Sequence, residues 1–194
     1  MPERCIQCTY FDQAGPDNTE RTLELAALRA AQLGSRHIAV ATTTGATAAK
    51  LVARLAGQGP HVVAVTHSAG FGEPNTQELL PEHREAILQG GGEILTCQHA
   101  LGGVNRAVRR KLGTYQLDEI IAFTLRSFGQ GMKVACEITV MAADAGLIPA
   151  GEEIIAIGGS GRGADTAAVL LSANAQDFFD LRVLEILCKP RAWR

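Results

Sequence analysis

The sequence predicts an α/β protein in which helices cover both faces of a mostly parallel β-sheet. Short apolar runs alternate with helical runs along most of the chain, as expected when a crossover helix follows each strand. The run from Val62 to Val65 has no polar face, which is typical of a strand buried on both sides. Glycine-rich or polar turns separate the runs. The pattern therefore predicts a three-layer, doubly wound fold with right-handed crossovers.

Residues 1–18 are predicted to form an N-terminal arm, and residues 19–194 a single α/β domain. The arm ends in a turn, and Asn18 or Thr19 can cap the helix that follows. We expect about five strands, with the last two running antiparallel at the edge of the sheet. The predicted elements are, in order, helix 20–33, strand 37–42, helix 45–56, strand 62–65, helix 81–89, strand 93–96, a mostly helical region 100–147 with breaks near Gly113 and at 129–131, and strands 152–157, 166–171 and 181–187.

The composition argues against several classes of protein. Of the 194 residues, 46% are hydrophobic and 20% are charged, which is the balance of an ordinary globular domain. A net charge of -2 without a basic block argues against nucleic acid as a partner, and an aromatic content of 5% argues against a base-stacking surface. No apolar run is long enough to cross a bilayer, and the N-terminus lacks the pattern of a signal peptide.

We therefore expect a cytoplasmic protein that does not contact membranes. Its five cysteines are expected to be free thiols, as is usual in a reducing compartment. The predicted helices have faces that are apolar enough to permit a homo-oligomer.

The most informative motif is the turn between the strand at 37–42 and the next helix. A strand that turns through Thr and Gly into a helix aims free backbone N–H groups at one point, where the helix dipole adds partial positive charge. Threonine hydroxyls add further donors. The turn therefore predicts a phosphate site, and the alternative is a tight connection with threonine caps. The predicted binding residues are Thr42, Thr43, Thr44, Gly45, Ala46 and Thr47.

A second glycine-rich turn follows the strand at 152–157. Its glycines allow a ligand to approach the backbone closely, and Arg162 offers a planar set of donors to an anion. Ligands of open α/β sheets bind at the carboxyl ends of the strands, where both turns are expected. The alternative is a flexible hairpin in which Arg162 pairs with Asp165. The predicted binding residues are Gly159, Ser160, Gly161 and Arg162.

A polar loop at 67–75 leaves the carboxyl end of another predicted strand. His67 and Phe71 are candidates to border a ring-shaped ligand group, and Gly70 and Gly72 would let the loop close. The alternative is a solvated loop that Phe71 anchors.

Three charged residues, Lys133, Glu137 and Asp144, share one stripe of an otherwise apolar predicted helix. At 3.6 residues per turn they lie within roughly 40° of one another. The favoured interpretation is a solvated face, and the alternative is a set of charges that reaches into a cleft. Cys136 on the same helix is expected to be a buried, inert thiol, because no histidine lies near it in the sequence.

Cys5 and Cys8 have the spacing of redox and zinc pairs. A redox pair normally follows a strand and begins a helix, whereas this pair lies in the predicted arm. A zinc site needs two more ligands, and the sequence has no second Cys-x-x-Cys. We therefore expect no metal site.

The order of a strand, the turn Thr-Thr-Thr-Gly-Ala-Thr, a helix and a second strand resembles the C-terminal α/β domain of pyruvate kinases. The closer likeness is to stand-alone pyruvate kinase α/β-domain proteins, and it covers residues 10–190. The distinctive stretches are Val65-Thr66-His67 with Gly70-Phe71, Phe128 to Gly131, Met141 to Pro149, and Ile157 to Thr166.

The resemblance implies a phosphorylated ligand. In pyruvate kinases, a turn in this position binds the phosphate of an allosteric sugar bisphosphate. The likeness to the stand-alone proteins points to flavin mononucleotide (FMN), with its phosphate at residues 42–47 and its ring bordered by the loop at 67–71 and the turn at 158–163. We expect no pyruvate kinase activity, because 194 residues leave no room for a catalytic barrel of about 250 residues.

The leading hypothesis is therefore a protein that binds a phosphorylated small molecule, with FMN as the first candidate. With FMN bound, it would be a candidate flavin-dependent oxidoreductase in which the cofactor supplies the chemistry. The alternatives are a non-catalytic sugar-phosphate sensor and, less favoured, phosphatase-like or transferase-like chemistry at Asp144 or Asp165. Gly45→Val is expected to block the phosphate and abolish binding while the domain stays folded.

Overall fold

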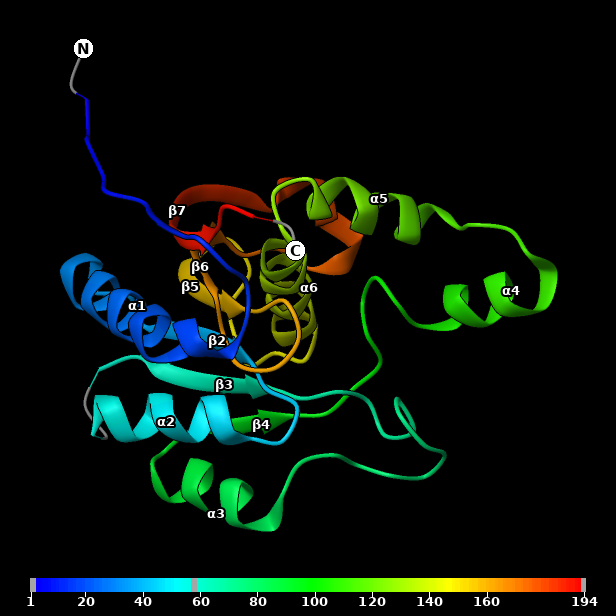
Figure 1. The fold of residues 1–194 in the computed structure, drawn as a ribbon, viewed down its shortest axis with the longest axis horizontal. Helices are drawn as coiled ribbons and strands as arrows, with labels where there is room; N and C mark the ends of the chain where they lie inside the picture. Colours follow the sequence, from blue (N-terminus) through cyan, green and yellow to red (C-terminus); the bar gives the residue numbers. More distant parts are fainter. Residues whose placement is uncertain (1–2, 57–58, 193–194) are drawn as a thin grey trace.

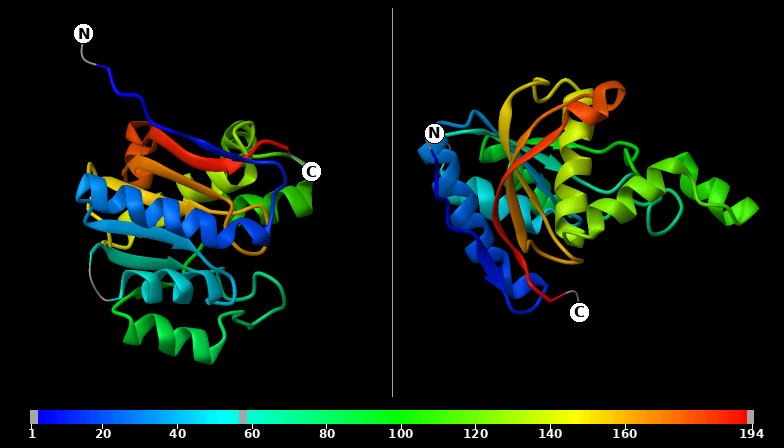
Figure 2. Two further views of the ribbon diagram at one scale, coloured as in Figure 1. Left: turned by 60° about the vertical axis from the view of Figure 1, so that its left-hand side comes forward. Right: turned by 90° about the horizontal axis from the view of Figure 1, so that it is seen from above.

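Within residues 3–56 and 59–192, which the computed structural model describes, seven strands form one sheet with helices on both faces (Figure 1, Figure 2). The strands are β1 (Thr9–Phe11), β2 (His37–Ala41), β3 (His61–Val65), β4 (Glu93–Leu95), β5 (Glu153–Gly158), β6 (Thr166–Leu171) and β7 (Arg182–Pro190). The helices are η1 (Pro16–Asn18), α1 (Thr19–Leu33), α2 (Ala46–Leu55), α3 (Pro81–Gln89), α4 (Val104–Leu112), α5 (Leu117–Arg126), α6 (Gln130–Asp144) and η2 (Ala175–Asp180).

The strands lie in the order β1-β7-β6-β5-β2-β3-β4. Strands β5, β2, β3 and β4 are parallel to one another, whereas β6 runs antiparallel to both β5 and β7. The predicted mostly parallel sheet with an antiparallel edge is confirmed. The sheet has more strands than expected, partly because residues 9–11 of the predicted arm form β1 and pair with β7. Three residues are too few for a hydrophobic period to reveal a strand.

Different helices cover the two faces of the sheet. Ile38 and Val40 of β2 pack into one core with residues of α1, α2 and α3. Ala39, which lies between them in the sequence, packs into the other core with α6, as the alternation of side chains along a strand requires. The chain thus forms the three layers that were predicted.

The region 100–147 contains three helices, α4, α5 and α6, and Gly113 and Gly129 lie between them as predicted. Helix α5 packs against α6, and α4 and α5 project away from the sheet (Figure 1). Among the described residues, no helix combines the length and the apolar character needed to cross a membrane.

The start of α6 lies in direct contact with the backbone of the sheet. A Cβ atom added to Gly158 of β5 would overlap the carbonyl oxygen of Gly131 in α6. A Cβ atom added to Gly131 would overlap the Thr166 side chain of β6. Because neither position has room for a side chain, the first turn of α6 is held beside the turn that follows β5.

We predict that Gly158→Ala lowers the free energy of unfolding by roughly 1–3 kcal/mol, because the added methyl group must push α6 away from β5. Urea unfolding followed by circular dichroism measures the change. Gly72→Ala is the control, since a Cβ atom there meets only the end of the Glu78 side chain, at 4.0 Å. An unchanged urea midpoint for Gly158→Ala would contradict this close packing.

Candidate functional site

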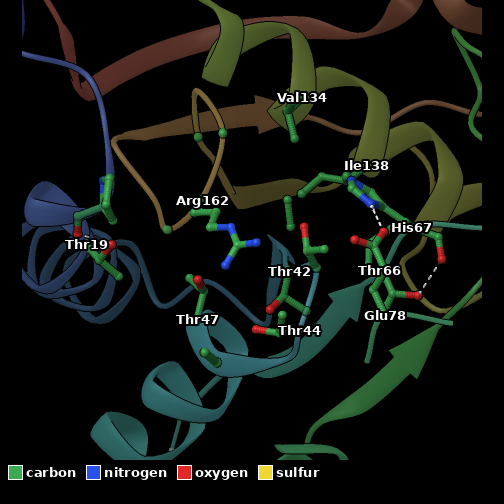
Figure 3. Close-up of a pocket in the computed structure, with 18 of the residues that line it drawn as sticks. Thr19, Thr42, Thr44, Thr47, Thr66, His67, Glu78, Val134, Ile138 and Arg162 are labelled. Carbon is green, nitrogen blue, oxygen red and sulfur yellow. Dashed lines mark hydrogen bonds and ion pairs between the residues drawn. The ribbon is translucent and has the colours of Figure 1, made fainter. Parts of the chain in front are cut away.

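A cavity of about 610 Å³ lies at the carboxyl ends of β2, β3 and β5, and its size is that of a small-molecule site. The turn before α2, the turn after β5, the loop after β3 and one side of α6 form its walls (Figure 3). This is the edge at which open α/β sheets bind ligands. Both glycine-rich turns that the sequence singles out therefore meet in one cavity.

The turn before α2 presents hydroxyl and N–H groups to the cavity. Thr42 and Thr47 are only 6% and 7% exposed, and neither hydroxyl hydrogen bonds to another described residue. Because α2 begins at Ala46, its first backbone N–H groups have no partner within the helix. The residues of the turn that line the cavity are Thr42, Thr43, Thr44, Ala46 and Thr47.

Gly45 does not line the cavity, in contrast to the other residues of this turn. It precedes α2 with a φ of 93°, and a Cβ atom there would lie 2.5 Å from His83 Cβ and 2.7 Å from Leu79 Cδ1. A side chain at position 45 would therefore point toward α3 rather than into the cavity. The packing argues against the expectation that valine at this position blocks a phosphate in a folded domain, because the side chain would collide with Leu79 and His83 instead.

Arg162 brings a positive charge into the cavity from the turn after β5. Figure 3 shows its guanidinium group directed toward the space beside Thr47 and Thr42. The cationic side chain and the start of α2 thus face the same region. The residues of this turn that line the cavity are Gly159, Gly161, Arg162 and Gly163.

The Asp165 carboxylate holds the same turn in place. It is fully buried and accepts hydrogen bonds from the backbone N–H groups of Ser160 and Gly15, both at 3.1 Å, and from the Thr166 hydroxyl at 2.9 Å. The pairing of Asp165 with Arg162 that the sequence left open does not occur. Ser160 contributes its backbone to this network rather than a side chain to the cavity.

Pro16 and Thr19 complete the wall at the start of α1, and sequence reasoning did not point to them. The Thr19 hydroxyl donates to the carbonyl oxygen of Pro16 at 2.6 Å and accepts from the backbone N–H of Ala164 at 3.1 Å. The end of the predicted arm therefore packs onto the turn after β5. No local pattern reveals a contact between segments so far apart in the sequence.

The loop after β3 contributes His67, whereas Phe71 does not line the cavity. The Phe71 ring centroid lies 4.0 Å from that of His67 and 4.9 Å from that of His99, and the Phe71 and His99 rings are nearly parallel. His67 Nδ1 lies 2.7 Å from Glu78 Oε2. Phe71 thus supports two histidines that line the cavity, instead of bordering it as predicted.

Lys133 and Glu137 form a buried ion pair on α6, and Glu137 lines the cavity. The favoured interpretation of a solvated face is therefore wrong for these two residues. Asp144 is exposed and accepts a hydrogen bond from the backbone N–H of Ala175 at 3.0 Å. The apolar residues of α6 could have indicated the burial of this pair. A helix that is apolar around most of its surface is buried together with its charged residues.

Burial is the main cause of the pKa shifts of the basic groups at this end of the cavity. It lowers the pKa of Lys133, although the Glu137 carboxylate acts in the opposite direction. Burial also lowers the pKa of His99, so its imidazole is neutral near pH 7. His99 Nε2 accepts a weak hydrogen bond from the backbone N–H of Ser68 at 3.4 Å. This end of the cavity therefore holds one buried ion pair and a neutral ring.

The fold and the cavity define a three-layer α/β domain with a ligand-sized space at the carboxyl ends of its parallel strands. Residues 20–170 match the family model of the pyruvate kinase alpha/beta domain. The match covers most of the 194 residues, so the chain belongs to this family. The resemblance noted in the sequence is confirmed.

We predict that Gly45→Val destabilises the fold, because valine would collide with α3 and is strained at a positive φ. The expected result is a lower midpoint of thermal unfolding, measured without ligand. Gly45→Ala should lower it as well, since the collision already begins at Cβ. A valine variant as stable as the parent chain, yet unable to bind ligand, would restore the expectation made from the sequence.

A second prediction concerns the thiols. Burial raises the pKa of Cys136 to about 12 and that of Cys188 to about 11, so neither should react with a thiol reagent at pH 8 in the folded protein. Cys5 is exposed and should react fastest. A count of modified cysteines by mass spectrometry, before and after unfolding, tests this. Rapid modification of Cys136 in the folded protein would show that α6 is less well packed than described.

Proposed function

We propose that this protein binds a phosphorylated small molecule in the cavity, with the phosphate at the turn formed by residues 42–47. The observation that carries the proposal is the convergence of three kinds of donor: the free N–H groups of α2, the hydroxyls of Thr42 and Thr47 at the cavity wall, and the Arg162 guanidinium. A phosphate accepts hydrogen bonds from all three. Lys50 also lines the cavity, but its ammonium group lies 2.8 Å from Glu20.

The charges of the cavity favour a ligand with one phosphate group. At the end away from Arg162, the cation of Lys133 is paired with Glu137, and His67 contacts Glu78. A sugar bisphosphate would bring its second phosphate against two carboxylates. An uncharged group at that end avoids this repulsion.

FMN is the first candidate, because it combines one phosphate with a large, uncharged, flat ring. The donors at residues 42–47 and Arg162 would hold the phosphate. Val134, Ile138 and Met141 of α6 offer an apolar surface to the ring, and His67 lies at its edge. The volume of about 610 Å³ lies within the range of cofactor sites. A non-catalytic sugar-phosphate sensor is the competing function.

Bound FMN would supply redox chemistry, and the protein would orient the ring and limit its contact with water. We therefore propose a flavin-binding protein, with oxidoreductase activity as the class to screen, and we expect no pyruvate kinase activity. A cytoplasmic location belongs to the same proposal, since all five cysteines are free in the structure, as is usual in reducing compartments.

The first test is the absorbance spectrum of the freshly purified protein, followed by titration of the ligand-free protein with FMN. We expect a flavin band or saturable quenching of flavin fluorescence. A colourless protein that neither binds FMN nor gains thermal stability from it would rule out FMN, and sugar phosphates would then be tested by thermal shift.

We predict that Arg162→Gln weakens FMN binding about 10-fold or more, because it removes a charged donor to the phosphate. Arg162 is exposed, so the variant should fold normally. Arg84→Gln is the matched control, since Arg84 is exposed on α3 and does not line this cavity. Equal FMN affinity of the two variants in the titration would contradict the proposed phosphate position.

A further inference from the structure

The buried ion pair of Lys133 and Glu137 has no role in the phosphate site. It lies on α6, one turn apart along the helix, and the two residues are 5% and 3% exposed. Removing two charges from water is costly, and the attraction between them often fails to compensate. Apolar side chains at both positions would suit the surrounding core at least as well. The stability of the fold therefore does not explain why two charged residues occupy these buried positions.

The two oxygen atoms of Glu137 are held in different ways. Oε2 binds the Lys133 ammonium group, and Oε1 accepts a hydrogen bond from the backbone N–H of Leu101 at 2.9 Å. Each carboxylate oxygen can accept a second hydrogen bond. Glu137 also lines the cavity, so a contact with a ligand would use this remaining capacity. Lys133 does not line the cavity, so its contact is with Glu137 rather than with the ligand space.

Two other polar groups at this end, His67 and His99, already have partners within the protein. His67 Nδ1 contacts Glu78, and His99 Nε2 accepts from the backbone of Ser68. The neighbouring side chains of α6 that line the cavity, Val134 and Ile138, are apolar. Glu137 is therefore a fixed acceptor between apolar neighbours on the wall that α6 forms.

We propose that Glu137 is a binding subsite that accepts a hydrogen bond from an uncharged N–H or O–H group of the ligand, with Lys133 as its positioning residue. The inference rests on the proposed function and adds to it the chemistry of the ligand's second end. A carboxylate accepts a hydrogen bond from a donor group, and it repels a phosphate. In oxidised FMN, the ring N–H is N3–H on the pyrimidine edge, whereas the opposite edge carries methyl groups. Glu137 therefore faces the pyrimidine edge.

The test compares FMN with N3-methyl-FMN, which lacks this donor. The ligand-free protein should bind FMN about 10-fold or more tightly than the methylated analogue, because a hydrogen bond to a charged group is lost. In Glu137→Gln, that preference should shrink several-fold. The difference between the two preferences isolates the contact between the carboxylate and N3–H.

Two further variants keep the test decisive. The double variant Lys133→Met/Glu137→Met replaces the whole pair by apolar groups, a change that proteins with buried ion pairs often tolerate. This variant should prefer FMN over the methylated analogue only as far as the added methyl group is too large for the site. Lys133→Met alone should reduce the preference while Glu137 is still present, because the carboxylate loses the ammonium group that holds its Oε2. Glu82→Gln, an exposed position on α3, is the control and should keep the parent preference.

The outcomes separate this inference from the proposed function. If the parent protein binds neither flavin, FMN is ruled out as the ligand, and the proposed contact with N3–H falls with it. If the parent protein binds FMN and its methylated analogue equally, or if Glu137→Gln keeps the full preference, FMN binding stands and the subsite alone is overturned.

Discussion

The backbone contact between the start of α6 and the sheet is the constraint on which the cavity depends. Gly158 and Gly131 leave no room for side chains between β5 and α6, so the helix is pressed against the strands. This contact places Val134, Glu137 and Ile138 along one wall of the cavity. It also sets the starting point of the turn that carries Arg162, which Asp165 then fixes through backbone N–H groups. One close approach thus determines the geometry of two walls.

The cavity has two ends that differ in charge. At one end, the start of α2 and the Arg162 side chain provide positive potential next to threonine hydroxyls. At the other end, Lys133 is neutralised by Glu137, and His99 is uncharged near neutral pH. The ligand that we propose for both ends has one anionic group and an uncharged remainder that carries hydrogen-bond donors.

Much of the fold could be predicted because it depends on local patterns. Apolar runs revealed the longer strands, and glycines such as Gly113 revealed the breaks between helices. The turn before α2, where we propose that phosphate binds, could be predicted for the same reason, since the strand, the turn and the helix that form it are consecutive in the sequence. Strand β1 could not be predicted, because three residues are too few to show the alternation of apolar and polar side chains that marks a strand.

The rest of the candidate site depends on contacts between distant segments. Pro16 and Thr19 reach the cavity only because their loop packs against Ala164. His99 reaches it from the segment after β4, where a single histidine gives no signal. Lys133 and Glu137 are buried where the sequence predicts a solvated face, because charge is normally a good guide to exposure. Gly45 was assigned to the ligand, although its missing side chain makes room for α3.

The most direct test of the account compares the affinity of the ligand-free protein for FMN with its affinity for riboflavin, which has the same ring and no phosphate. Calorimetric titration at constant ionic strength gives both values. We predict that FMN binds at least about 100-fold more tightly, because the phosphate meets several charged or aligned donors at residues 42–47 and Arg162. Equal affinities, or binding of neither flavin, would contradict it.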